Sequence, residues 1–348
     1  MRKLFFNGSF FVLILLMLVI SACGGTPSSK GKGQPDWVRD PYAKYNKQSN
    51  VAAVGSGSDR PTAEKSAFGA LVAIFGQEIQ VDEKISVTYQ EAVKSGVTAN
   101  WSEDTRVDST YATSTGMDTL VGAEIGEVWF DGASTHFAVA VLNKSRAAAA
   151  YTDMIRSNQV MINNLTNMPT AEKNTLEGYA RYQFAAAVAD INITYGNLLS
   201  YIGAPAQGLK KGDEYRIEAA NITKTIPVAL RVQNDKSARI QGAFSRALAD
   251  LGFRTGGNNS RYVLDVKVAS APVAIANSQN KWTRIEVTAN LIDTSTNSTL
   301  VPFNFNSREG HTSQAEADNR AIVAAERRIN EEYAKMLNNY LSQLLPKK

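Results

Sequence analysis

The chain has 348 residues, of which 44% are hydrophobic and 20% are charged, with a formal net charge of +4. This composition is typical of a globular protein and excludes a disordered chain, and the length is enough for two domains of ordinary size. The charge is nearly neutral and lysine and arginine do not cluster, so we expect no nucleic acid as a partner. The single cysteine, Cys23, excludes an intramolecular disulfide and a thiolate metal site.

The first 23 residues have the order of a secretory signal peptide. A basic pair at 2–3 precedes an uninterrupted apolar run at 10–20, and small residues close the segment. The sequence Ile-Ser-Ala-Cys at 20–23 resembles the lipobox of bacterial lipoproteins. The resemblance implies that residues 1–22 are removed and that Cys23, the first residue of the mature chain, carries lipid and holds the protein to a membrane.

Two other interpretations of this segment are weaker. A membrane-spanning helix needs about 20 apolar residues, and Asn7, Gly8 and Ser9 interrupt the run on its N-terminal side. A buried core helix of a cytosolic protein does not explain a basic pair directly before so apolar a run. Because one acyl chain alone binds a membrane reversibly, several chains on Cys23 would be needed to hold the protein there. Gly24 after the cysteine favours the outer membrane, by analogy with enteric sorting.

The mature chain is expected to start with a tether and a first αβ domain. Residues 23–34 are predicted to be a flexible tether, because they are rich in glycine, serine and lysine and have almost nothing to bury. Residues 35–144 are predicted to form a domain in which one helix covers an antiparallel sheet. Its expected elements are a strand at 51–55, a helix at 61–75, and extended segments at 79–91, 101–113, 119–130 and 135–142.

Short motifs in this region occur in a recognisable order. They are Pro35-Asp36-Trp37, the turn Val-Gly-Ser-Gly at 54–57, the alanine-bearing helix that follows it, and a strand that ends at 139–144. In these motifs the chain resembles the Lpp-twenty (20 kDa) family of bacterial lipoproteins over roughly residues 35–150. The resemblance implies an anchored envelope protein and supplies no catalytic residues. This chain is more than twice as long as the matching segment.

A pair of long helices is predicted at 145–203. Apolar positions support the first helix as far as Pro169, where the second is expected to begin before ending at Gly203. Two helices joined by a short turn should pair antiparallel. We interpret this hairpin either as a spacer between domains or as a docking surface for a partner, in which Tyr179 and Tyr182 take part.

A second αβ domain is predicted at 226–348, after a linker at 204–225 that begins with proline, glycine and lysine. Its expected elements, in the order βαβββα, are a strand at 226–232, a helix at 235–251, strands at 262–268, 285–291 and 300–305, and a terminal helix. Ser313 to Glu316 has the pattern of a capping box for that helix. The apolar stripe expected on it is Ile322, Ala325, Ile329, Tyr333, Met336, Tyr340 and Leu344. The predicted fold class is therefore α+β: two small αβ sandwich domains joined by a long helical hairpin.

Catalytic candidates are few. The two histidines, His136 and His311, have no second histidine at metal-ligand spacing, so we expect no metal site. A Ser/His/Asp site built from Ser307, His311 and Asp318 is an alternative, although the chain has no Gly-x-Ser-x-Gly elbow.

Two further patterns have a structural interpretation. Gly55-x-Gly57 between a strand and a helix invites a phosphate-loop reading, but Arg60 stands where the dinucleotide pattern requires a third glycine. Glu331 and Glu332 are paired carboxylates that we expect to face solvent on a helix rather than to flank a sugar.

The sequence therefore predicts a non-enzymatic, membrane-anchored envelope lipoprotein without a cofactor, which acts as an assembly or scaffolding factor through contacts with an envelope protein partner. An anchored periplasmic hydrolase and a small-ligand binding lipoprotein are the alternatives. The expected location is the bacterial cell envelope, with the outer membrane favoured over the inner one and the folded part in the periplasm or at the surface.

Overall fold

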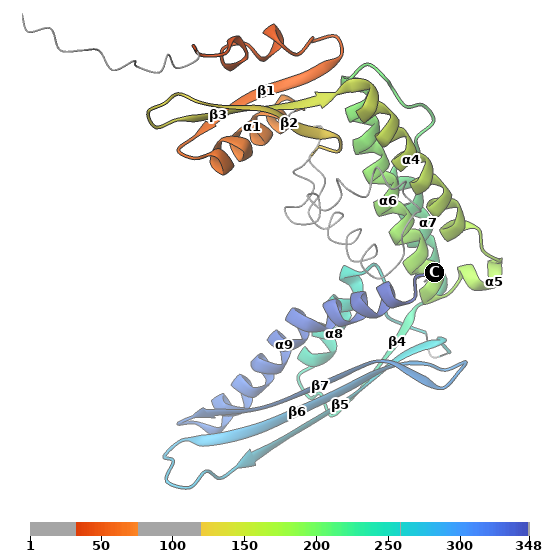
Figure 1. The fold of residues 1–348 in the computed structure, drawn as a ribbon. Coiled ribbons are helices and arrows are strands. Elements are labelled where there is room, and N and C mark those ends of the chain that lie inside the picture. The colour runs from red at the N-terminus through yellow and green to blue at the C-terminus, as the bar shows by residue number, and fades with distance from the viewer. Residues whose placement is uncertain (1–32, 76–119, 258, 347–348) are drawn as a thin grey trace, which may run out of the picture.

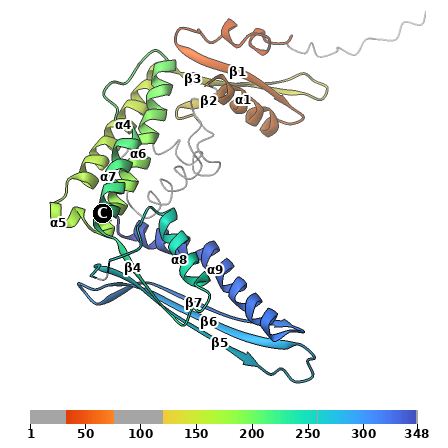
Figure 2. The same ribbon diagram turned by 180° about the vertical axis from the view of Figure 1, so that it is seen from behind.

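The computed structural model describes residues 33–75, 120–257 and 259–346. Within them the fold is mixed α+β, with one three-stranded and one four-stranded sheet. Both views show the two sheets at opposite ends of a bundle of long helices (Figures 1 and 2). Cys23, most of the tether and the strands expected at 79–91 and 101–113 lie outside the described residues.

The first sheet has the strand order β1-β3-β2 and is antiparallel throughout. Its strands are β1 (Asn50–Gly57), β2 (Ala123–Phe130) and β3 (His136–Asn143). Helix α1 (Arg60–Phe75) packs on one face. Its buried residues recur at a spacing of four, which turns one side of the helix toward the sheet: Ala63, Ala67, Leu71 and Phe75. The helix and these strands confirm the elements predicted for this part of the chain.

The opposite face of this sheet is covered by the segment that precedes β1. Two short 3₁₀ helices, η1 (Asp36–Val38) and η2 (Pro41–Ala43), lie there. Trp37 is only 3% exposed and packs with residues of β1 and β3, among them Ala52 and Val139. The tryptophan predicted to lie at the start of the fold therefore belongs to a small second core.

The bundle consists of α4 (Lys144–Thr166), α6 (Leu176–Tyr201) and α7 (Gly212–Thr225). Helix α6 is at its centre, since both α4 and α7 pack against it, and it is buried on nearly all sides. A helix that is apolar all round needs such surroundings. With 26 residues, α6 is about 39 Å long at 1.5 Å per residue, so the bundle spans most of the distance between the two sheets.

Two predictions about the bundle are wrong in detail. The second long helix does not begin at Pro169: the short helix α5 (Thr170–Lys173) comes first, and α6 begins after Thr175, whose hydroxyl accepts a hydrogen bond from Gly178 N over 3.1 Å. The linker predicted at 204–225 contains helix α7, because a second amphipathic pattern follows its proline and glycine residues. The residues of α7 that are buried against the bundle include Tyr215, Ala219 and Ile222.

Polar contacts fix how these helices sit on one another. Asn158 of α4 donates a hydrogen bond to Asn192 of α6 over 2.9 Å, and both side chains are buried. Asp190 of α6 accepts a hydrogen bond from Gly212 N, the first residue of α7, over 2.9 Å, and it also pairs with Arg216. The N-cap residue of α7 makes no side-chain cap bond, so a carboxylate of the neighbouring helix serves the free N–H groups of its first turn.

The second sheet has the order β4-β5-β6-β7, with β4 parallel to β5 and the other pairs antiparallel. Its strands are β4 (Val228–Gln233), β5 (Tyr262–Val273), β6 (Lys281–Asp293) and β7 (Ser298–His311). Helix α8 (Arg239–Asp250) connects the two parallel strands. Gly252, which follows its C-cap residue Leu251, has the left-handed φ of +81° that commonly ends a helix. The predicted order βαβββα is confirmed, although the last three strands are longer than predicted.

Helix α9 (Gln314–Gln343) packs on β6, β7 and α8 and reaches α6. Its buried residues recur at every fourth position: Ala317, Ala321, Ala325, Ile329, Tyr333, Leu337 and Leu341. Four residues turn a helix by about 400°, so this line drifts by about 40° per step and winds around α9. The stripe predicted from the sequence shares Ala325, Ile329 and Tyr333 with this line. Its other members are partly buried against the same core: Ile322, Met336, Tyr340 and Leu344. Ser313 is the N-cap residue but makes no side-chain cap bond, so the predicted capping box is not formed.

Candidate functional site

The structure does not bring the predicted catalytic residues together. Ser307 donates its hydroxyl to Glu309 Oε1 over 2.6 Å, and Asp318 accepts hydrogen bonds from Gln314 and Thr283. The side chain of His311 accepts a hydrogen bond from Ser313 N over 3.2 Å. Each side chain of the proposed Ser/His/Asp site thus bonds to a different neighbour. The hydrogen bonds from serine to histidine and from histidine to aspartate that such a site requires are not formed.

The second histidine lies at the start of the central strand of the first sheet. His136 of β3 lies against Phe130 of β2 with ring centroids 4.5 Å apart. Its buried Nδ1 has no hydrogen-bond partner among the described residues. Across residues 33–75, 120–257 and 259–346, no group of three or more histidine, cysteine, aspartate or glutamate side chains is placed to hold a metal ion.

The glycines of the Gly55-x-Gly57 turn serve packing. A Cβ on Gly55 would overlap the backbone of Ala67 in α1, and one on Gly57 would lie 2.7 Å from Ala63 N. The helix N-terminus is occupied as well, since Thr62 N donates to Asp59 Oδ1 over 2.8 Å. Hydrogen bonds from Thr62 hold the pKa of the Asp59 carboxyl below its usual value. A carboxylate thus already fills the position that a phosphate would take.

The two tyrosines proposed for partner docking are internal. Tyr179 and Tyr182 are 4% and 9% exposed. The hydroxyl of Tyr179 donates to Leu251 O over 2.5 Å, and its ring lies 4.7 Å from that of Phe253. Burial raises the pKa of the Tyr179 phenol. This side chain joins α6 to the second αβ unit, so the prediction that it contacts a partner is wrong.

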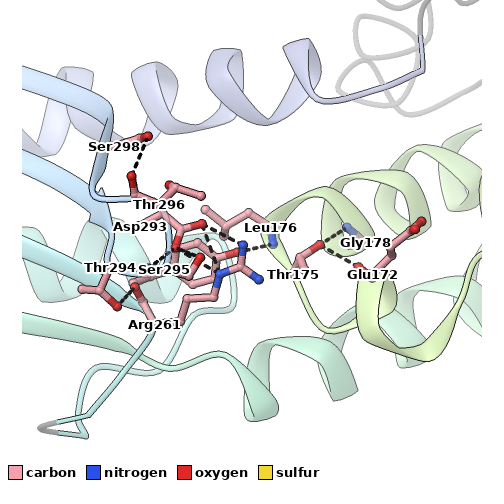
Figure 3. Close-up of polar contacts among 11 residues, drawn as sticks. Glu172, Thr175, Leu176, Gly178, Arg261, Asp293, Thr294, Ser295, Thr296 and Ser298 are labelled. Atoms are coloured by element: carbon pink, nitrogen blue, oxygen red, sulfur yellow. Dashed lines mark hydrogen bonds and ion pairs between the residues drawn. The ribbon is translucent and has the colours of Figure 1, made fainter.

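Close to this contact lies an ion pair between a buried carboxylate, Asp293, and a partly exposed arginine, Arg261 (Figure 3). Arg261 binds both carboxylate oxygens of Asp293, with Nη2 2.8 Å from Oδ2, and Ser295 donates its hydroxyl to Oδ1 over 2.6 Å. Burial alone would raise the pKa of Asp293, but the hydrogen bonds from Arg261 and Ser295 outweigh it, so the pKa lies below its usual value. Next to this pair, Leu176 N at the start of α6 donates to Tyr262 Oη over 3.2 Å.

These contacts have a mechanical consequence. The hydrogen bonds of Leu176 and Tyr179 attach α6 to the second αβ unit. The ion pair ties the start of β5 to the end of β6 beside them, and Figure 3 shows it close to Leu176. Loss of Arg261 would leave the buried carboxylate of Asp293 without its charged partner. The orientation of the second sheet on the bundle is therefore fixed by specific bonds as well as by apolar packing. We call this cluster of Leu176, Tyr179, Arg261, Tyr262 and Asp293 the junction.

A groove runs between β7 and α9. It encloses about 390 Å³ and is mostly polar. The residues that line it come from both elements: Asn304, Phe305, Asn306, Ser307, Glu309, Ala324, Arg327, Arg328 and Glu331. Of the two carboxylates predicted to face solvent, Glu331 is exposed at this groove, whereas Glu332 is partly buried and pairs with Arg328 over 2.7 Å. The groove itself was not predicted, because strand and helix positions far apart in sequence form it.

No protein-family model and no curated protein sequence matches this chain. The resemblance to the Lpp-twenty family therefore stays a prediction.

Three solved structures show a distant similarity to this chain. The secreted protein HP1454 from Helicobacter pylori is 12% identical, with a TM-score of 0.40 over 80% of this chain and 97% of that one. A minor lipoprotein from Acinetobacter baumannii is 14% identical over 34% of this chain and 93% of its own, with a TM-score of 0.24. Lipoprotein GNA1162 from Neisseria meningitidis is 12% identical over 30% of this chain and 99% of its own, with a TM-score of 0.21. At these values the similarity says nothing about function.

Among the described helices, none combines the length and the apolar character that a membrane span requires.

Proposed function

We propose that this chain is a non-enzymatic envelope lipoprotein, anchored through lipid on Cys23, that acts as an assembly or scaffolding factor through protein contacts. In this proposal the two αβ units act as separate domains, and the helical bundle is a rigid spacer between them. The proposed location is the outer membrane, with the folded part in the periplasm or at the cell surface.

The observation that carries the proposal is the long edge strand β7 with its groove. Strand β7 has 14 residues, and within the described residues it pairs only with β6. Natural proteins usually shorten, cover or charge such an edge, because it is a template for pairing with another chain. An open edge with a polar groove beside it supports a surface for contact with another protein.

The test compares the native chain with Cys23→Ala in membranes of the producing bacterium. We expect the native chain to fractionate with the outer membrane, to carry acyl chains on the peptide that begins at Cys23, and to co-purify with a defined envelope protein. We expect Cys23→Ala to be soluble in the periplasm and to lose that partner. A native chain without lipid, or a lipidated chain that recovers no more protein than Cys23→Ala does, contradicts the proposal.

A further inference from the structure

The hydrogen-bond pattern of the second sheet shows which residues of β7 face its open edge. Thr294 N donates to Arg261 O over 2.8 Å, and this pair continues the antiparallel register of β6 with β5. Backbone groups in such a ladder alternate between the two sides of a strand. Even-numbered residues of β6 therefore bond to β5, and odd-numbered ones bond to β7. From Pro302 to His311 the register is unbroken, so even-numbered residues of β7 point their N–H and C=O groups outward.

The position of Pro302 agrees with this assignment. Proline has no N–H, and in sheets it is confined to places where no ladder bond is lost, such as the outer side of an edge strand. Pro302 is even-numbered and lies opposite Asn290, so it costs no bond to β6. It also blocks pairing at its own position. The open stretch of the edge is therefore 304–310, where the outward-pointing residues are Asn304, Asn306, Arg308 and Gly310.

Three arginines beside this stretch form no ion pair with a described residue. Acidic residues also lie on both faces: Glu286 is opposite Asn306 on the outer face, and Glu309 and Glu331 line the groove with Arg327. On the outer face Arg308 lies directly opposite Arg284 of β6, both are exposed, and neither forms an ion pair with a described residue. Arg284 and Arg308 form a non-hydrogen-bonded pair of the antiparallel ladder, the type of pair in which opposite side chains come closest. Like charges directly opposite each other in such a pair are destabilising. On the groove face the exposed Arg327 of α9 also has no ion pair with any residue that the structure describes.

We propose that residues 304–310 of β7 bind an extended acidic segment of a partner protein as an added strand. The inference rests on the proposed function and names its contact surface and the chemistry of the partner. The outward N–H and C=O groups of β7 bond to the main chain of the added strand. An acidic side chain opposite Arg308 relieves the repulsion between Arg284 and Arg308.

A second copy of the chain fits this edge less well. Antiparallel pairing of two copies centred on Arg308 would bring Arg284 and Arg308 of both copies together, which makes four adjacent arginines. Pairing centred on Ser307 would place the second copy's Asn306 opposite Arg308, which leaves the repulsion between Arg284 and Arg308 in place. Neither arrangement supplies an acidic side chain opposite Arg308.

The test measures binding of two synthetic peptides to the full mature chain in detergent. Both peptides have nine residues of alternating threonine and valine, and they differ only in a central glutamate or lysine. We expect fluorescence anisotropy at low salt to show that the glutamate peptide binds at least ten-fold more tightly. We expect Arg308→Glu to abolish or reverse this preference. Lys267→Glu is the matched control, because it makes the same charge change on an exposed residue of the central strand β5 and should leave the preference intact.

A second variant tests the main-chain bonds. Asn306→Pro removes one outward N–H and, like Pro302, no bond to β6, so we expect it to lose peptide binding while its thermal unfolding stays close to that of the native chain. Equal binding of the two peptides, or no binding of either, overturns the inference. Self-association of the native chain that Arg308→Glu abolishes also overturns it and assigns the edge to a second copy. If the peptides fail while an envelope partner still co-purifies through Cys23, the proposed function stands and only its surface is wrong.

Discussion

The hydroxyl groups of Tyr333 and Tyr262 are both buried but have opposite effects on the stability of the fold. Tyr333 of α9 lies in an aromatic cluster with Phe244 and Phe303, and its buried hydroxyl has no hydrogen-bond partner among the described residues. Burial raises the pKa of this phenol. The hydroxyl of Tyr262, by contrast, accepts the first N–H of α6, from Leu176. A helix leaves its first N–H groups without partners in its own backbone, so only the second hydroxyl satisfies a buried donor.

We expect Tyr333→Phe and Tyr262→Phe to change stability in opposite directions. Removal of an unsatisfied buried hydroxyl should raise the free energy of unfolding by up to about 1 kcal/mol, whereas loss of the acceptor for Leu176 N should lower it by about 1–2 kcal/mol. Urea denaturation of the two variants beside the native chain measures both effects. A loss of stability in Tyr333→Phe would mean that its hydroxyl has a partner that this account lacks.

At the scale of elements, α7 depends on close approach to α6. Asp190 accepts a hydrogen bond from Gly212 N, and a Cβ on Gly212 would overlap this carboxylate and lie 2.6 Å from Ala186 O. The glycine is therefore needed where two helices meet, and it is not a sign of a flexible linker.

We expect Gly212→Ala to lower the free energy of unfolding by about 1–3 kcal/mol, because the added methyl group forces α7 away from Asp190. Gly69→Ala in α1 is the matched control, since nothing lies within 4 Å of its Cβ position. In the interior of a helix this exchange should raise stability by about 0.5–1 kcal/mol. Thermal denaturation of both variants checks the prediction, and equal stabilisation by both would show that the contact at Gly212 is loose.

Elements with a strong local pattern could be predicted from the sequence. The spacing of Ala67, Leu71 and Phe75 predicts α1, and the alternation at 285–291 predicts the middle of β6. The far ends of β5 and β6 could not be predicted, because polar and small residues such as Ser270 and Arg284 occupy an open sheet face there and give no apolar alternation. Helix α7 was not predicted, although Tyr215, Ala219 and Ile222 follow one another at the spacings of four and three that are typical of one helix face.

The candidate site was less predictable than the fold. The groove joins β7 to α9, and the junction joins Leu176 to Tyr262, so both depend on how distant segments pack. One signal was present in the sequence: Pro302 within a strand pattern indicates an edge strand. The prediction that Tyr179 and Tyr182 contact a partner was wrong. The spacing of aromatic residues along a helix is the same whether they pack inside a bundle or meet a partner, so the sequence could not distinguish the two cases.

At the scale of the whole molecule, the junction holds the second sheet on the bundle. Its ion pair depends on pH in a defined direction. Because the pKa of Asp293 is lower in the folded protein than the value of about 3.9 in an unfolded chain, the stability it contributes is complete above that pH. This contribution is lost as the pH falls through the lowered pKa of the folded state.

We expect Asp293→Asn to lower the free energy of unfolding at pH 7 by about 1–2 kcal/mol, a value reduced from that of a fully buried pair because Arg261 is partly exposed. The difference from the native chain should shrink below about pH 4. Urea denaturation between pH 7 and pH 3 measures it, with the exposed Asp250→Asn as the control that should follow the native curve. A difference that stays constant across this range would contradict the role assigned to the ion pair.

The central claim is that the anchored chain works by contact with another envelope protein. Mass spectrometry of proteins crosslinked to the native, membrane-bound chain tests it most directly. We expect one reproducible partner, crosslinked to residues of β7 or α9 and lost both in Cys23→Ala and in Arg308→Glu. A lipidated chain that gives no crosslinked partner, or a partner that survives both substitutions, would contradict it.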